Sequence, residues 1–180
     1  MKLDRKKPDF HRPLTNIEVA EIFRDFSLYE IPFLGVFSVD EIPVNFLLDE
    51  NYWCIIVNLD RATESGSHFI AVARNPNGSV FVFDSIALND ELMPAIINKL
   101  IKALESFTMK KIWRLYKPIQ DIFSSACGYY CVFFILIWHF CQATYQDMDQ
   151  ICAPLIKEKN LKKNDLYVYK KNQSNHYSLC

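Results

Sequence analysis

The chain has 180 residues, of which 51% are hydrophobic and 14% aromatic, and its formal net charge is −1. This length suits one domain over residues 1–180, and the composition supplies a sizeable core and excludes disorder over most of the chain. The near-neutral charge excludes a strong field directed at nucleic acid or at a membrane surface. The longest apolar run, Tyr129 to Phe140, is too short to span a bilayer.

The start of the chain and the cysteine pattern predict a location. No apolar segment follows the polar, basic residues 1–13, which we expect to form a flexible arm and not a secretory signal. Six cysteines without such a signal argue against a disulfide framework. The sequence therefore favours an intracellular, reduced protein that is not secreted.

Helical and strand signals alternate through the first half of the chain. Thr15 and Glu18 have the spacing of a capping box, and apolar residues then recur at helical spacing as far as Phe26. Residues 44–50 fit either a helix or a strand. Aromatic and β-branched residues predict a central strand over 52–60 and two further strands over 68–73 and 79–84. The segment 74–78, "RNPNG", joins the last two as a turn.

The second half begins with a predicted helix over 89–106, with Asn89 or Asp90 as its cap and Pro94 in its first turn. A strand over 110–116 and a loop follow. The segment from Cys127 to about Gln142 is apolar on all sides, which predicts a helix buried inside the molecule. A short helix over about 147–158 and a polar tail, loose from about residue 168, complete an α+β domain with a mostly antiparallel sheet packed with helices.

Cys127 lies where the buried helix would begin. The helix N-terminus and its free N–H groups favour thiolate over thiol, and Ala126 and Gly128 leave room for a substrate backbone. The alternative is that Cys127 is a small buried hydrophobe, which is the interpretation we prefer for Cys131 and Cys141. From position alone, the two interpretations of Cys127 remain open.

A nucleophilic thiol needs a base, and His68 is the best placed of four histidines. His11 and His176 lie near the chain ends, and His139 would lie about 18 Å along the helix from Cys127. A turn centred on Pro76 would place His68 directly opposite Asp84, since both are equally far from it, whereas a tight Asn77–Gly78 turn would shift this pairing. Asp84 could then orient the imidazole. The alternative is that His68 is a strand-end residue and Asp84 an acid that flanks a helix. Gln120, in the loop before the helix, could donate to an oxyanion with the Cys127 backbone N–H, or be an ordinary loop residue.

Three segments in this order resemble the adenovirus-type cysteine endopeptidases, which also occur in Polinton/Maverick elements and related viruses. They are "PFLGVFSVDEIP", "GSHFIAVARNPNGSVFVFDS" and "QDIFSSACGYYCVFF", within residues 32–134. The resemblance implies a papain-like cysteine protease fold of the adenain and SUMO-protease type. It also implies that Cys127 is the nucleophile, His68 the general base, Asp84 its orienting acid and Gln120 part of the oxyanion hole.

The resemblance further implies cleavage after glycine in viral or mobile-element precursor proteins of the capsid type. A monomer working in the host nucleus, the cytoplasm or the virion fits that maturation role. SUMO-specific proteases have the same fold and the same order of His, Asp, Gln and Cys. Deconjugation of SUMO or ubiquitin-like proteins therefore remains the alternative, with a catalytically silent interaction module as a further one.

The sequence departs from the adenoviral pattern in several places. Phe69 follows the histidine where the adenoviral enzymes usually have Trp, and the acid is Asp84 where they have Glu. The cysteine that joins their activating peptide aligns with Met109, and the acidic pI of about 6.4 does not favour DNA as an activator. The sequence therefore requires no cofactor, and it leaves activation by a peptide or by DNA open but disfavoured. A zinc site from Cys127, Cys131 and His68 lacks a fourth ligand and the spacing of a zinc signature.

Overall fold

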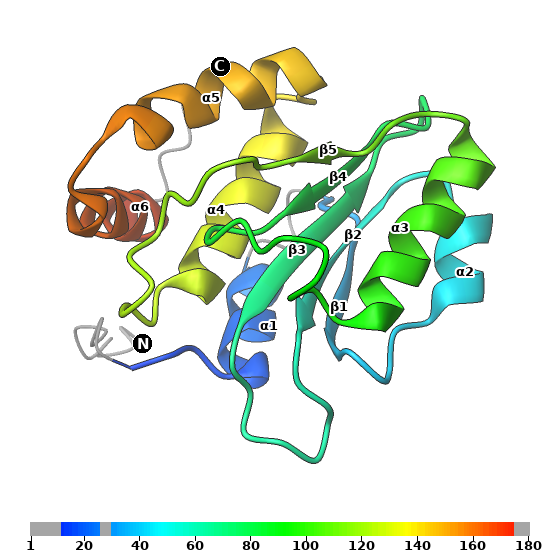
Figure 1. Cartoon of the computed structure of the whole chain (residues 1–180), viewed down its shortest axis with the longest axis horizontal. Coiled ribbons are helices and arrows are strands. Elements are labelled where there is room, and N and C mark those ends of the chain that lie inside the picture. Colours follow the sequence, from blue (N-terminus) through cyan, green and yellow to red (C-terminus); the bar gives the residue numbers. More distant parts are fainter. Residues whose placement is uncertain (1–11, 26–29, 175–180) are drawn as a thin grey trace.

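The structure is a computed structural model that describes residues 12–25 and 30–174 (Figure 1). Nearly all of the expected flexible arm, together with Phe26, His11 and His176, lies outside the described residues. The described residues form one sheet in the order β1-β2-β3-β4-β5. Its strands are β1 (Phe33–Ser38), β2 (Trp53–Asn58), β3 (Phe69–Arg74), β4 (Val80–Phe83) and β5 (Trp113–Arg114). The helices are α1 (Asn16–Asp25), α2 (Val44–Asp49), α3 (Ala95–Thr108), α4 (Cys127–Phe140), α5 (Tyr145–Lys157) and α6 (Leu161–Ser174).

The sheet is mixed. The central pairs, β2 with β3 and β3 with β4, are antiparallel, whereas the edge pairs, β1 with β2 and β4 with β5, are parallel. Strands and helices pack as an α+β domain, so the predicted fold class is confirmed. Both edge pairings join segments that the chain connects through helices, as parallel strands require.

Helices cover both faces of the sheet, so the central strands β2, β3 and β4 are buried at every position. Figure 1 shows α2 and α3 on one side and α1, α4, α5 and α6 on the other. Along β2, Cys54 and Ile56 join the core that contains α4, whereas Ile55 and Val57 join the core that contains α3. This alternation is the two-residue period of a strand with both faces buried.

Helix α4 confirms the prediction of a buried central helix. All of its residues from Cys127 to Trp138 are buried, and it packs against β3. A helix that is apolar all round finds a stable place only when other elements surround it, here the sheet, α1, α5 and α6. Its N-terminus is therefore held firmly in place.

The two predicted helix starts have different outcomes. At α1 the capping box is confirmed, because the Thr15 N–H donates to Glu18 Oε2 at 2.8 Å and the Glu18 N–H donates to Thr15 Oγ1 at 3.2 Å. At α3 the predicted start was wrong. Asn89 accepts from the N–H groups of Glu91 and Leu92 in a separate turn, and the helix begins after Pro94.

Two elements were not predicted from the sequence. Strand β1 occupies the segment around Gly35, and α6 extends through the region where a loose tail was expected. Few apolar residues of α6 are buried, so its pattern is weak. The polar residue Asn164 instead anchors it, since Nδ2 donates to the carbonyls of Ile119 at 3.0 Å and Leu155 at 2.8 Å.

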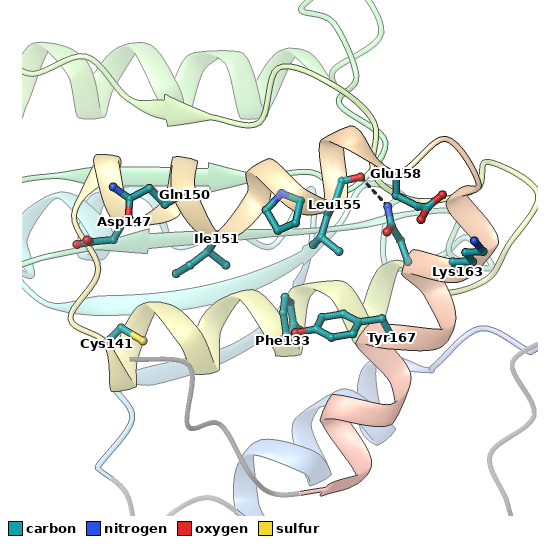
Figure 2. A pocket seen from close by; sticks show the side chains of 11 residues that line it. Phe133, Cys141, Asp147, Gln150, Ile151, Leu155, Glu158, Lys163 and Tyr167 are labelled. Atoms are coloured by element: carbon teal, nitrogen blue, oxygen red, sulfur yellow. Dashed lines mark hydrogen bonds between the residues drawn. The ribbon is translucent and has the colours of Figure 1, made fainter.

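Helices α4, α5 and α6 enclose a groove of about 740 Å³. Figure 2 shows Phe133 and Tyr167 on one side of it, facing Ile151 and Leu155 of α5. The residues proposed from the sequence for catalysis do not line this groove. Among the described residues, every helix is too short or too polar to cross a lipid bilayer.

Candidate active site

His68 and Asp84 lie at neighbouring strand ends. His68 directly precedes β3 and Asp84 directly follows β4, and His68 Nε2 lies 2.7 Å from Asp84 Oδ1. Both side chains are buried, with 11% and 6% of their surfaces exposed. A short hydrogen bond between two buried side chains fixes the plane of the imidazole ring.

The predicted register of this hairpin was wrong by two residues, although the contact that it predicted forms. Arg74 pairs with Val80, and Asn75 N–H donates to Ser79 O at 2.8 Å, so the turn is centred on Asn77. Gly78 has a φ of +83°, which produces a three-residue loop in place of the turn assumed. A shift of two residues keeps the same face, so His68 and Asp84 become diagonal neighbours instead of direct ones.

Asp84 is held by more than the histidine. Its Oδ1 accepts the Ile86 N–H at 3.0 Å, and its Oδ2 accepts the Leu88 N–H at 2.9 Å. Burial would raise the pKa of Asp84, but the hydrogen bond and charge of His68 and these two N–H groups hold it below its ordinary value. The carboxyl group is therefore an anion that accepts hydrogen bonds at both oxygens.

Cys127 is the first residue of α4, and its side chain lies close enough to His68 to raise the pKa of that imidazole. Since His68 Nε2 faces Asp84, Nδ1 is the nitrogen left for the sulfur. The three side chains form a line from carboxylate through imidazole to thiol. No side chain caps the start of α4, so the N–H groups of its first turn remain available to a ligand.

The electrostatics of this line favour a charged imidazole. Burial lowers the pKa of His68, but the hydrogen bonds to Asp84 and Cys127, together with their charges, outweigh it and raise the pKa to about 9. A protonated imidazole between a carboxylate and a sulfur is the arrangement of a thiol nucleophile with its base and orienting acid.

Gln120 is 2% exposed in the loop before α4. Its Oε1 accepts from Ser85 Oγ at 2.5 Å, and its Nε2 donates to Ser124 O at 3.0 Å. Gln120 is thus fixed between the residue that follows Asp84 and the loop that leads into Cys127. Ser85 was not predicted from the sequence, because a single serine after a strand carries no distinguishing signal.

A cleft of about 220 Å³ opens beside Cys127. Its walls come from the segment 13–16, the loop 61–67 and the ends of β1 and β2. Gly66 has a φ of +84°, and a Cβ there would lie 2.6 Å from Asn58 Nδ2, so this wall requires glycine. Gly128 does not make room for a substrate as expected, because Leu14 fills that space, 3.2 Å from the position of a Cβ.

The other cysteines lie outside this arrangement. Burial raises the pKa of the Cys54, Cys131 and Cys152 thiols, which suits inert core residues. Cys141 differs from the expectation, because it is half-buried and disulfide-bonded. In the part of the chain that the structure describes, no group of three or more His, Cys, Asp or Glu side chains could hold a metal ion.

The α+β fold, with a thiol at the start of a buried helix and a His–Asp pair at the neighbouring ends of β3 and β4, defines the class of papain-like cysteine peptidases. Residues 33–180 match the family model described as adenovirus endoprotease, so the chain belongs to that family. No curated protein matches the chain by sequence.

Two solved structures are similar in fold. The ASFV pS273R protease has a TM-score of 0.54 and 14% identity over 89% of this chain, which spans only 66% of that protein. A structure of AvrA with a deletion at L154, with IP6 and CoA, has a TM-score of 0.47 and 19% identity, covering 85% of this chain and 68% of AvrA. The first of these supports the fold alone.

The shifted pKa values predict how stability depends on pH. The pKa of His68 is raised from 6.5 to about 9, so its pairing stabilises the fold fully below pH 6.5, and this contribution disappears as the pH rises through 9. The pKa of Asp84 is lowered, so its contribution is present above its ordinary value of 3.8 and disappears as the pH falls through its folded value. The free energies of unfolding of wild type and His68→Asn, measured in urea, should therefore differ most at about pH 5.5 and least at about pH 10. An equal difference at both pH values would contradict the charged pair.

Proposed function

We propose that Cys127, His68 and Asp84 are the catalytic triad of this endopeptidase and that Gln120 belongs to its oxyanion hole. The observation that carries the proposal is the buried line Asp84–His68–Cys127, which opens on a cleft. Nucleophile, base and orienting acid each have the partner that their role needs.

The chemistry follows from this geometry. The Cys127 thiolate attacks the carbonyl carbon of the scissile peptide, and the electron pair of the C=O bond moves to oxygen. The Cys127 backbone N–H and Gln120 Nε2 donate to that oxyanion. When the C–N bond breaks, the His68 imidazolium gives its proton to the leaving amine. His68 then takes a proton from the water that hydrolyses the thioester.

We propose that the substrates are viral or mobile-element precursor proteins of the capsid type, cleaved after glycine. The cleft beside Cys127 is small, and a glycine forms part of its wall, which supports a substrate residue without a side chain next to the scissile bond. Met109, the position aligned with the cysteine that binds an activating peptide, is an exposed methionine at the end of α3. The proposal therefore requires no covalently joined peptide, and the acidic pI of about 6.4 does not favour DNA as an activator.

A fluorogenic peptide series tests the cleavage preference. We expect kcat/KM to fall by about 10- to 100-fold when glycine before the scissile bond becomes alanine or leucine, because the side chain has no space. Each peptide is assayed with and without iodoacetamide and with and without DNA. Equal turnover of the glycine and leucine peptides would contradict the narrow cleft, and turnover only with DNA would contradict an activator-free enzyme.

Deconjugation is the alternative activity for the same triad. Aldehyde derivatives of SUMO and of ubiquitin distinguish deconjugation from precursor cleavage when they are incubated with the protein. A deconjugating enzyme binds the folded modifier as well as its C-terminal glycines. Labelling by either aldehyde at concentrations where a short Gly-Gly aldehyde does not react would favour deconjugation. No turnover of any peptide or precursor, with an unmodified Cys127, would favour an interaction module.

A further inference from the structure

We propose that Ser85 is a positioning residue for catalysis, because the Ser85 hydroxyl donates to the Gln120 side-chain oxygen and fixes the rotation of the Gln120 amide. The amide nitrogen then points away from Ser85, and one of its N–H groups remains available to the oxyanion. This inference rests on the proposed role of Gln120. The two residues are 35 positions apart in the sequence, yet their side chains lie 2.5 Å apart in the folded chain. Ser85 is fully buried, so water cannot substitute for its hydroxyl.

The neighbours of Gln120 determine which atom of its side-chain amide is the oxygen and which is the nitrogen. A glutamine side chain has one oxygen that accepts and one nitrogen that donates two hydrogens. The atom 3.0 Å from Ser124 O must be the nitrogen, because a backbone carbonyl only accepts. The oxygen therefore faces Ser85 and needs a donor, and the Ser85 hydroxyl supplies it.

This arrangement leaves one amide hydrogen for a substrate. Ser124 O takes one of the two N–H groups of Nε2, and the second has no acceptor among the described residues. A donor without a protein partner in a buried position is costly unless a ligand accepts from it. A developing oxyanion next to Cys127 is the acceptor that the proposed mechanism supplies.

The structural role of Ser85 belongs to its backbone carbonyl, whereas the proposed positioning role belongs to its side chain. Ser85 O accepts the backbone N–H groups of Ile119 at 2.9 Å and Gln120 at 3.1 Å, and any residue at this position keeps both bonds. Replacing Ser85 by alanine thus leaves the loop attached to the end of β4. It removes only the hydroxyl that keeps the Gln120 amide from rotating.

Ser85 also follows Asp84 directly in the chain. One turn after β4 therefore orients the imidazole through Asp84 and the oxyanion donor through Ser85. Since both side chains extend from one dipeptide, the base and the oxyanion donor keep a fixed relative geometry. Pre-organised donors of this kind stabilise a transition state without rearrangement.

A double-mutant cycle tests the inference with Ser85→Ala, Gln120→Ala and the combined variant on a glycine-containing peptide. We expect Gln120→Ala to lower kcat by about 100-fold and Ser85→Ala by about 10-fold, with KM changed less than about twofold. Adding Ser85→Ala to Gln120→Ala should lower kcat by less than about twofold further, because Ser85 acts through Gln120. Independent, multiplicative losses would overturn the proposal.

Two further readouts distinguish positioning from a general loss of structure. Alkylation of Cys127 by iodoacetamide forms no oxyanion, so its rate in Ser85→Ala should stay within about twofold of wild type, whereas inhibition by a peptide aldehyde should weaken about 10-fold. Ser85→Cys, which keeps a weak donor, should recover part of the loss in kcat. Thr108→Val removes a hydroxyl that donates to Leu104 O in α3, and as the matched control it should change none of these values.

A measurement without substrate separates this inference from the proposed function. In ¹⁵N NMR spectra, hydrogen exchange of the Gln120 side-chain amide should be faster in Ser85→Ala than in wild type by at least about fivefold. That result supports the positioning role even if no peptide is cleaved, in which case the proposed function alone fails. Unchanged exchange would overturn the role of Ser85 whatever the activity.

Discussion

Replacing Cys127 by alanine is expected to abolish peptide cleavage, with a loss in kcat of at least about 10³-fold. The Cys127 sulfur lies beside His68 at the start of α4, and alanine offers no nucleophile to the substrate carbonyl. Cys127→Ser should be almost as inactive, because a hydroxyl at this position has a much higher pKa and is a weaker nucleophile than a thiolate. The measurement is turnover of the glycine-containing fluorogenic peptide.

The fold provides a matched control for this substitution. Cys152 is a buried, free thiol in α5, remote from the cleft, so Cys152→Ala should retain activity at the cost of some stability. Peptide mapping after iodoacetamide treatment should find the label on Cys127 and not on Cys54, Cys131 or Cys152. Retained turnover in Cys127→Ala would remove the basis of the proposed mechanism.

Replacing Asp84 by asparagine is expected to lower kcat by about 10²- to 10⁴-fold while the chain still folds. The carboxylate accepts three hydrogen bonds, from His68 and from the N–H groups of Ile86 and Leu88. An amide can keep its oxygen toward His68 only by turning its NH₂ toward the Leu88 N–H. In the opposite orientation the NH₂ faces His68 and forces the imidazole into the wrong tautomer.

Either orientation of the asparagine has a measurable consequence. One buried donor remains unsatisfied, so the free energy of unfolding should fall by about 1–3 kcal/mol. The charge that raises the pKa of His68 is also lost, so NMR titration should show the pKa below its wild-type value of about 9. Asp149→Asn is the control, since Asp149 accepts from Trp113 Nε1 at 2.8 Å far from the cleft and should leave kcat unchanged. Equal activity of Asp84→Asn and Asp149→Asn would contradict the role of Asp84.

The sequence alone identified the candidate site through residue chemistry. A thiol at the head of an apolar run, a histidine at the start of a strand and an acid across the hairpin from it were enough to nominate Cys127, His68 and Asp84. Their proximity was predicted with the wrong register, and it survived because strand geometry repeats every two residues. A register error of one residue would have placed the two side chains on opposite faces of the sheet.

What could not be predicted from the sequence depends on partners distant in the chain. The link between Ser85 and Gln120 exists only because the end of β4 and the loop before α4 meet in space. Helix α6 is too polar for its pattern to be recognised, and it is held by hydrogen bonds to backbone carbonyls of other segments.

By itself, the sequence determined what local rules control: the capping box of α1, the buried strand β2, the buried helix α4 and the residue types able to perform thiol chemistry. Tertiary structure decided the register of the hairpin between β3 and β4, the edge strand β1, the position of α6 and the orientation of the Gln120 amide. The physical reason is that propensity and periodicity act over neighbouring residues, whereas register, edge pairing and buried polar contacts depend on which distant groups remain to be satisfied once the core has packed.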